Sequence, residues 1–138
     1  MTTELIFSTN SLFYNVTFDR NADSWTFLFA DKIYASASGF WRLYKKNKIV
    51  FVSLDNGHQF GLTKPLDLVE EIKNELAEKK LIKIEVAKDT FDLTLTLTNE
   101  IKIEIYIASS AYETYDFSIN DKRYIGLGSG DIAIMDSH

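Results

Sequence analysis

Apolar and polar residues alternate along much of this chain. In FDLTLTLT (91–98), apolar side chains alternate with aspartate and threonine, and IKIEIYI (101–107) has isoleucine at every second position. Strict alternation predicts antiparallel strands with one buried and one solvent-facing side. The segment LIKIEVAK just upstream has a similar pattern, so we expect a three-stranded meander over 81–107. Asn99-Glu100 has the right length for the hairpin turn between its last two strands.

Aromatic and β-branched residues predict further strands on both sides of this meander. The upstream candidates are LFYNVTFD (12–19), SWTFLFAD (24–31), KIYASAS (32–38) and KIVFVSLD (48–55). Turn-forming residues separate them at 20–23 and at 45–47, and Asn56-Gly57 marks a turn after the last one. Downstream, YETYDFSIN, RYIGLG and GSGDIAIM predict three more strands, with a turn at 120–122.

One segment, KPLDLVEEIKNELAEKK (64–80), has helical periodicity. Its apolar residues recur at helical spacing, at Leu66, Val69, Ile72 and Leu76. Pro65 suits the first turn, where its missing N–H is no loss, and acidic residues follow near the positive end of the helix dipole. We therefore predict one main helix that lies across the sheet with its acidic side in water.

These patterns together predict a single α+β domain over residues 1–138. We expect a mainly antiparallel sheet, strongly curved or barrel-like, with the main helix packed on it. A chain of 138 residues with 46% hydrophobic and 14% aromatic residues has ample material for one core. The pattern leaves open the strand order and whether the sheet closes.

The charge and residue types narrow the possible functions. The formal net charge of −5 disfavours general nucleic-acid binding, which normally needs a basic surface. It is compatible with binding to a basic protein partner. It is equally compatible with a simpler role, in which the charge only keeps the protein soluble. The lack of cysteine excludes disulfides, thiolate nucleophiles and zinc–thiolate sites. Residues 1–18 contain Glu4 and no basic region, which is unlike a signal peptide, and no apolar run approaches a membrane span of about 18 residues. We expect a cytoplasmic protein that does not act at a membrane.

Few residues could support catalysis. His138 is the last residue, so His58 is the one plausible imidazole base, with Asp55 three residues before it. No Gly-x-Ser-x-Gly motif presents a nucleophile, and metal binding would need nitrogen ligands that the sequence lacks. GLGSGD (126–131) has no P-loop lysine and precedes an apolar strand, so its glycines indicate a bulge or hairpin. A turn histidine with local hydrogen bonds is the favoured role of His58, and we expect no metal and no cofactor.

Two aromatic clusters have both a structural and a functional interpretation. In GFWRLYKK, Trp41 and Arg42 are of types frequent in interaction hot spots or nucleic-acid surfaces. In YETYDF, alternation places Glu113 and Tyr115 on the buried face and Asp116 on the outer face. A buried carboxylate needs a charged partner. We therefore expect Trp41 to anchor the core or a sheet edge, Arg42 to pair with Glu113, and Tyr115 to lock the sheet.

The order FWRL, SLDNGHQFG, a P-L-D helix start, DLTLTL, YETYDF and GLGSGDI resembles a small bacterial family over roughly residues 36–134. Its members are short, acidic and cysteine-free, and several resemble immunity proteins of polymorphic toxin systems. The matching pairs are Trp41-Arg42, Asp92-Leu93 and Tyr112-Glu113; Tyr115 stands where tryptophan is often expected. The resemblance implies a non-enzymatic cytoplasmic protein that binds and blocks a cognate toxin domain, and it implies that these motif residues form the scaffold.

Our leading hypothesis is therefore an immunity protein that neutralises a basic toxin domain, for example a nuclease, by occlusion. Acidic residues could imitate a polyanionic substrate. The expected toxin-binding residues are the acids Asp67, Glu70, Glu71, Glu75, Glu78 and Asp116. The alternatives are a small hydrolase or nuclease that uses His58 and Asp55, and a structural homodimer formed through exposed sheet edges.

Overall fold

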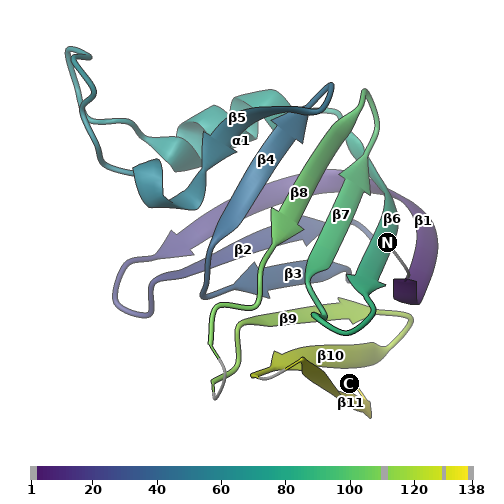
Figure 1. Ribbon diagram of the computed structural model, residues 1–138. Coiled ribbons are helices and arrows are strands. Elements are labelled where there is room, and N and C mark those ends of the chain that lie inside the picture. Colours follow the sequence, from purple (N-terminus) through teal and green to yellow (C-terminus); the bar gives the residue numbers. More distant parts are fainter. Residues whose placement is uncertain (1–2, 110–111, 129, 137–138) are drawn as a thin grey trace.

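Eleven antiparallel strands form one sheet in the computed structural model, which describes residues 3–109, 112–128 and 130–136 (Figure 1). The strands are β1 (Thr3–Asp19), β2 (Ser24–Phe29), β3 (Tyr34–Ala37), β4 (Trp41–Lys45), β5 (Lys48–Val52), β6 (Lys80–Ala87), β7 (Leu93–Leu97), β8 (Ile101–Ile105), β9 (Tyr115–Ile119), β10 (Lys122–Leu127) and β11 (Asp131–Asp136). The described helices are the α-helix α1 (Leu68–Leu76) and the 3-10 helix η1 (Ser53–Asp55). The order across the sheet is β11-β10-β9-β3-β2-β1-β6-β7-β8-β4-β5, so the end strands β11 and β5 do not pair and the sheet does not close. The sheet is strongly curved (Figure 1).

Strand β1 divides the sheet into two halves. Its residues 3–12 pair with β6, and its residues 13–19 pair with β2. The register shifts between Ser8 and Ser11 and again between Phe13 and Asn15, and such irregularities bend a strand and increase its twist. We call the part from residues 3–12 through β6, β7, β8 and β4 to β5 half A. The part from residues 13–19 through β2, β3, β9 and β10 to β11 is half B.

The two halves share one hydrophobic core. The ring of Trp41 on β4 meets the rings of Trp25 and Phe27 on β2 edge to face, with centroids 5.2 and 5.5 Å apart. Phe7 on β1 packs against Tyr124 on β10, with ring centroids 5.1 Å apart. The apolar face of α1 joins the same core through fully buried Leu68, Ile72 and Leu76. In Figure 1, α1 lies behind β4 and β5.

The predicted meander is confirmed by β6, β7 and β8, which are neighbours in the sheet. Asn99 and Glu100 form its last hairpin turn, with φ values of 62° and 61°. Positive φ at both central residues is typical of the type I′ turn, whose twist matches that of paired strands. The predicted turn between β9 and β10 has the same feature at Asn120 and Asp121, with φ of 55° and 62°.

Several predicted boundaries were wrong. Strand β1 begins at Thr3, well before residue 12, and the strand predicted to reach Asp55 ends at Val52. Ser53 begins η1, and its hydroxyl accepts a hydrogen bond from the backbone N–H of Trp41 at 3.0 Å.

The start of the helix was also misplaced. Helix α1 begins at Leu68, so Pro65 precedes the helix and does not occupy its first turn. Asp67 is the N-cap, and its carboxylate accepts a hydrogen bond from the Glu70 N–H at 3.2 Å. The cap satisfies a backbone donor that has no partner within the helix.

Tyr115 fills the space above a glycine on the neighbouring strand. It is 2% exposed, and its hydroxyl donates to the Phe91 carbonyl at 2.8 Å. Tyr115 pairs with Gly126 across β9 and β10, and a Cβ at position 126 would lie 2.5 Å from the tyrosine ring. Only glycine therefore leaves room for this ring, an arrangement that resembles aromatic rescue of a strand glycine.

We expect Gly126→Ala to lower the free energy of unfolding by about 1–3 kcal/mol, because the new methyl group collides with a ring that is anchored at its hydroxyl. The same substitution in a Tyr115→Ala background should cost much less. Urea unfolding of the four proteins of this double-mutant cycle measures the coupling. Equal costs in both backgrounds would contradict the contact.

Candidate functional site

Exposed apolar side chains concentrate between β5 and the loop that precedes α1. Five of the twelve large hydrophobic residues that are exposed in the described chain fall within 14 positions: Ile49, Val50, Leu54, Phe60 and Leu62. Phe60 is 64% exposed and stacks on the ring of His58, with centroids 5.4 Å apart. Clustered apolar exposure is typical of interaction surfaces, whereas single exposed residues are common anywhere. We name residues 49–78 the β5–α1 corner (Figure 1).

Hydrogen bonds hold the parts of this corner together. The Gly57 N–H donates to the Leu66 carbonyl at 2.8 Å, and the Leu66 N–H donates to the His58 carbonyl at 2.7 Å. At the start of α1, the Leu68 N–H donates to the Asn56 side chain at 2.9 Å. The loop between η1 and α1 is therefore tied at its base, while its tip projects from the sheet (Figure 1).

The corner also carries most of the net charge. Residues 49–78 contain six carboxylates and two lysines, a net charge of −4 within a chain total of −5. Four of the predicted binding acids are exposed there: Asp67, Glu70, Glu71 and Glu78. Glu75 is partly buried and pairs with Lys45 on β4 at 2.9 Å, so its charge is neutralised within the protein. The structure thus brings five of the six predicted acids into one corner.

Because Asp67 caps α1, its substitution tests a structural role within this surface. We expect Asp67→Ala to lower the free energy of unfolding by about 1 kcal/mol, and Asp67→Asn to cost less because an amide oxygen can still cap. Thermal unfolding of both variants measures the difference. If the alanine and asparagine variants were equally destabilised, the cap would not be the cause.

Asp116, the sixth predicted acid, does not belong to this surface. It lies on β9 in half B, where the Arg123 guanidinium donates to its carboxylate from Nε at 2.8 Å. The Tyr34 hydroxyl also donates to it at 3.0 Å. The hydrogen bond with Asp116 raises the pKa of Arg123 above its ordinary value. Asp116 therefore lies apart from the acids of the β5–α1 corner, and its role in toxin binding stays a prediction.

The predicted pair of Arg42 and Glu113 does not form. Glu113 is exposed because β9 begins only at Tyr115, so the strand alternation does not extend back to it. Arg42 instead lies 5.3 Å from the ring centroids of both Phe40 and Tyr106, and it donates to the Tyr44 hydroxyl at 3.2 Å. Cation–π contacts with two rings replace the predicted salt bridge. Trp41 is fully buried in the core, as described above.

Three tyrosines titrate above their ordinary range. Burial, followed by hydrogen bonds with Glu104 and Tyr44, raises the pKa of Tyr106; its hydroxyl donates to Glu104 at 2.5 Å. Burial also raises the pKa of Tyr115 and of Tyr34, with smaller contributions from Asp92 and Asp116 respectively. Each of these environments favours the neutral form of its tyrosine.

These shifts predict a loss of stability in alkali. Above a pH of about 10 the unfolded chain releases tyrosine protons that the folded chain retains, so the free energy of unfolding falls as the pH rises. The relevant range is about pH 9 to pH 11, because the ordinary pKa of tyrosine is about 10. We expect the free energy of unfolding to fall less steeply across this range in Tyr115→Phe than in the parent protein. Urea unfolding across this range measures it, with the exposed Tyr112→Phe as control. An unchanged slope in Tyr115→Phe would contradict the prediction.

The geometry around His58 offers little for catalysis. Its side chain is exposed, and its contact with Asp55 is a backbone hydrogen bond, from the His58 N–H to the Asp55 carbonyl at 3.1 Å. His58 lines neither of the two hollows described below. Within the described ranges, no group of three or more His, Cys, Asp or Glu side chains could hold a metal ion. His138 lies outside those ranges.

The glycine-rich segment forms the connection between β10 and β11, as predicted, and Gly130 has a φ of +73°. Ser129 in that segment lies outside the described residues. Among the helices that the structure describes, none is long and apolar enough to cross a lipid bilayer.

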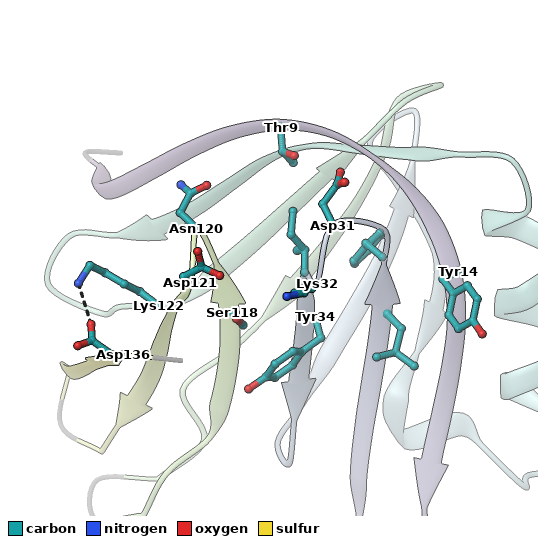
Figure 2. A pocket seen from close by; sticks show the side chains of 13 residues that line it. Thr9, Tyr14, Asp31, Lys32, Tyr34, Ser118, Asn120, Asp121, Lys122 and Asp136 are labelled. Atoms are coloured by element: carbon teal, nitrogen blue, oxygen red, sulfur yellow. Dashed lines mark hydrogen bonds and ion pairs between the residues drawn. The ribbon is translucent and has the colours of Figure 1, made fainter. Parts of the chain in front are cut away.

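No sequence pattern indicated two hollows that lie mainly in half B. The larger, a groove of about 960 Å³, is lined by residues of β1, β2, β3, β9, β10, β11 and two turns (Figure 2). The smaller, of about 280 Å³, is lined in part by Glu113 and Asp116. Neither could be found from a local pattern, because each combines residues from segments that are distant in sequence.

Comparisons with protein-family models, with curated proteins and with solved structures find no significant match to this chain. The resemblance to immunity proteins therefore stays a prediction.

Proposed function

We propose that this chain is a cytoplasmic bacterial immunity protein that binds a cognate toxin domain through the β5–α1 corner and blocks it by occlusion. One observation carries the proposal. The same 30-residue segment holds the main cluster of exposed apolar residues and four exposed acids, Asp67, Glu70, Glu71 and Glu78. The resemblance to immunity proteins supplies the class of partner.

The two properties of the corner suit different parts of an interface. Exposed Phe60, Leu62 and Leu54 can be desolvated by a partner, which is the main source of affinity in protein complexes. The surrounding acids, Glu70 and Glu71 among them, attract a basic partner and orient it during encounter. Toxin nucleases are commonly basic because their substrates are polyanions, so a cognate nuclease domain has the complementary charge.

The rival functions have weaker support. A hydrolase based on His58 and Asp55 needs a concave site, whereas His58 stands exposed on the loop of the corner. A homodimer could form by pairing of β5 or β11, the two strands at the ends of the sheet. The mass of the purified protein across a concentration series tests the homodimer directly.

The test of the immunity function is co-expression with the toxin domain encoded by a neighbouring gene. We expect the protein to restore growth and to form a stoichiometric complex that weakens with added salt. Glu71→Lys should raise the Kd at least about tenfold at low salt, and Phe60→Ala about thirtyfold, as for a central apolar contact.

Matched controls separate the surface from general effects. Glu4→Lys changes the net charge equally but lies at the start of β1, and Tyr112→Ala removes an even more exposed aromatic residue outside the corner. Both controls should bind as the parent protein does. If Glu4→Lys and Glu71→Lys weakened binding equally, the corner would not be the interface. If no complex formed at micromolar concentrations, the immunity function itself would be wrong.

A further inference from the structure

The larger groove lies on the outer face of half B, at the end where two hairpin turns meet β1. Its floor includes Leu28, Tyr34 and Ser118, which are direct neighbours across β2, β3 and β9. Asp31 and Lys32 in one turn, and Asn120 and Asp121 in the other, line it together with Tyr14 of β1 (Figure 2). Its volume of about 960 Å³ lies at the upper end of the range for small-ligand sites, about 300–1,000 Å³.

A free hydroxyl in this floor offers hydrogen bonds to a ligand. Ser118 lines the groove, and although the residue is only 4% exposed, its hydroxyl is not among the fully buried side-chain atoms. It forms no hydrogen bond with another described residue, so water in the groove can be its partner. A hydroxyl group of a bound molecule would supply the partner, since Ser118 can both donate and accept.

The aromatic part of the floor is fixed in advance. The Tyr34 hydroxyl donates to Asp116, whose carboxylate is held by Arg123, so the ring has a defined orientation. Tyr14 adds a second ring from β1 and is 78% exposed. The anchored ring of Tyr34 offers an apolar face on which a flat ligand can stack without a large loss of side-chain entropy.

The charges of the lining nearly balance. Lys122 pairs with Asp136 at 3.2 Å, and Asp31 accepts a hydrogen bond from the buried Ser11 hydroxyl at 3.0 Å. What remains is one lysine, Lys32, beside the carboxylates of Asp31 and Asp121 (Figure 2). A strongly anionic ligand would meet two carboxylates, and a strongly cationic one would meet the lysine. The lining therefore suits a neutral ligand with many donors and acceptors.

We propose that this groove binds a neutral oligosaccharide. A sugar ring has apolar faces that stack on Tyr34 and Tyr14, and hydroxyls that can pair with Ser118, Asn120 and Asp121. This site is independent of the proposed toxin interface, because its lining residues lie outside the β5–α1 corner.

Backbone amide shifts in two-dimensional NMR test the proposal, with cellotriose, maltotriose and N,N′,N″-triacetylchitotriose as neutral probes and glucuronate and glucosamine as charged ones. The probes are used at about 10 mM because we expect the binding to be weak, with a Kd in the millimolar range. We expect at least one neutral trisaccharide to shift the amide signals of Leu28, Tyr34 and Ser118. No shift with any neutral trisaccharide, or shifts with the charged probes alone, would overturn it.

Two variants show whether the groove itself binds the sugar. Ser118→Ala should weaken the affinity about tenfold without lowering the urea midpoint, because it removes a hydroxyl that lines the groove and makes no hydrogen bond with the described residues. Tyr14→Ala should also weaken it, whereas Tyr112→Ala, 79% exposed in the parent and outside the groove, should not. Unchanged binding in both Ser118→Ala and Tyr14→Ala would refute the site.

Discussion

The bend in β1 brings the two halves of the sheet face to face, and both the core and the surface sites depend on it. At the bend, Ser11 is fully buried and donates its hydroxyl to Asp31 at 3.0 Å, while the Thr9 hydroxyl lies 2.7 Å from Ser11. The Phe13 N–H bonds to the Lys79 carbonyl at 2.8 Å, so the polar groups freed by the register shift find new partners. These bonds let one strand serve both halves, whose shared core includes the contact of Trp41 in half A with Trp25 in half B.

Charge is distributed unequally over the resulting surface. In the β5–α1 corner, Glu70 and Glu71 are exposed and have no oppositely charged partner among the described residues, whereas Glu75 is held by Lys45. In half B, Asp116 and Arg123 neutralise each other, and so do Lys122 and Asp136. Unpaired charge acts at a distance and favours fast association with a large partner, whereas paired charge acts by contact and favours recognition of shape. The two surfaces are therefore suited to different kinds of ligand.

Local patterns in the sequence predicted the features that depend on neighbours in the chain. The alternation in β7 and β8 needs no distant partner to define a buried face, and Asn99-Glu100 adopts its turn from its own φ preferences. The helix acids follow from helical periodicity for the same reason. The misplaced Glu113 shows the limit of this logic: alternation indicates which residues share a face only inside a strand, and it does not show where the strand begins. Leu28 meets Tyr34 across the β2–β3 hairpin, but Ser118 joins them only through the pairing of β3 with β9, which no local pattern encodes.

That pairing has a consequence for the order in which the chain can fold. Tyr34 pairs with Ser118, so 83 intervening residues, which include all the remaining strands of half A, must be made before β3 gains its outer neighbour. Closing so long a loop costs entropy before any contact repays it, and pairings of this kind fold slowly. During synthesis on the ribosome, half A can assemble while β3 still presents an open edge. The hairpins from β9 to β11 then act as the final closure, which covers that edge and protects the chain from pairing with its neighbours.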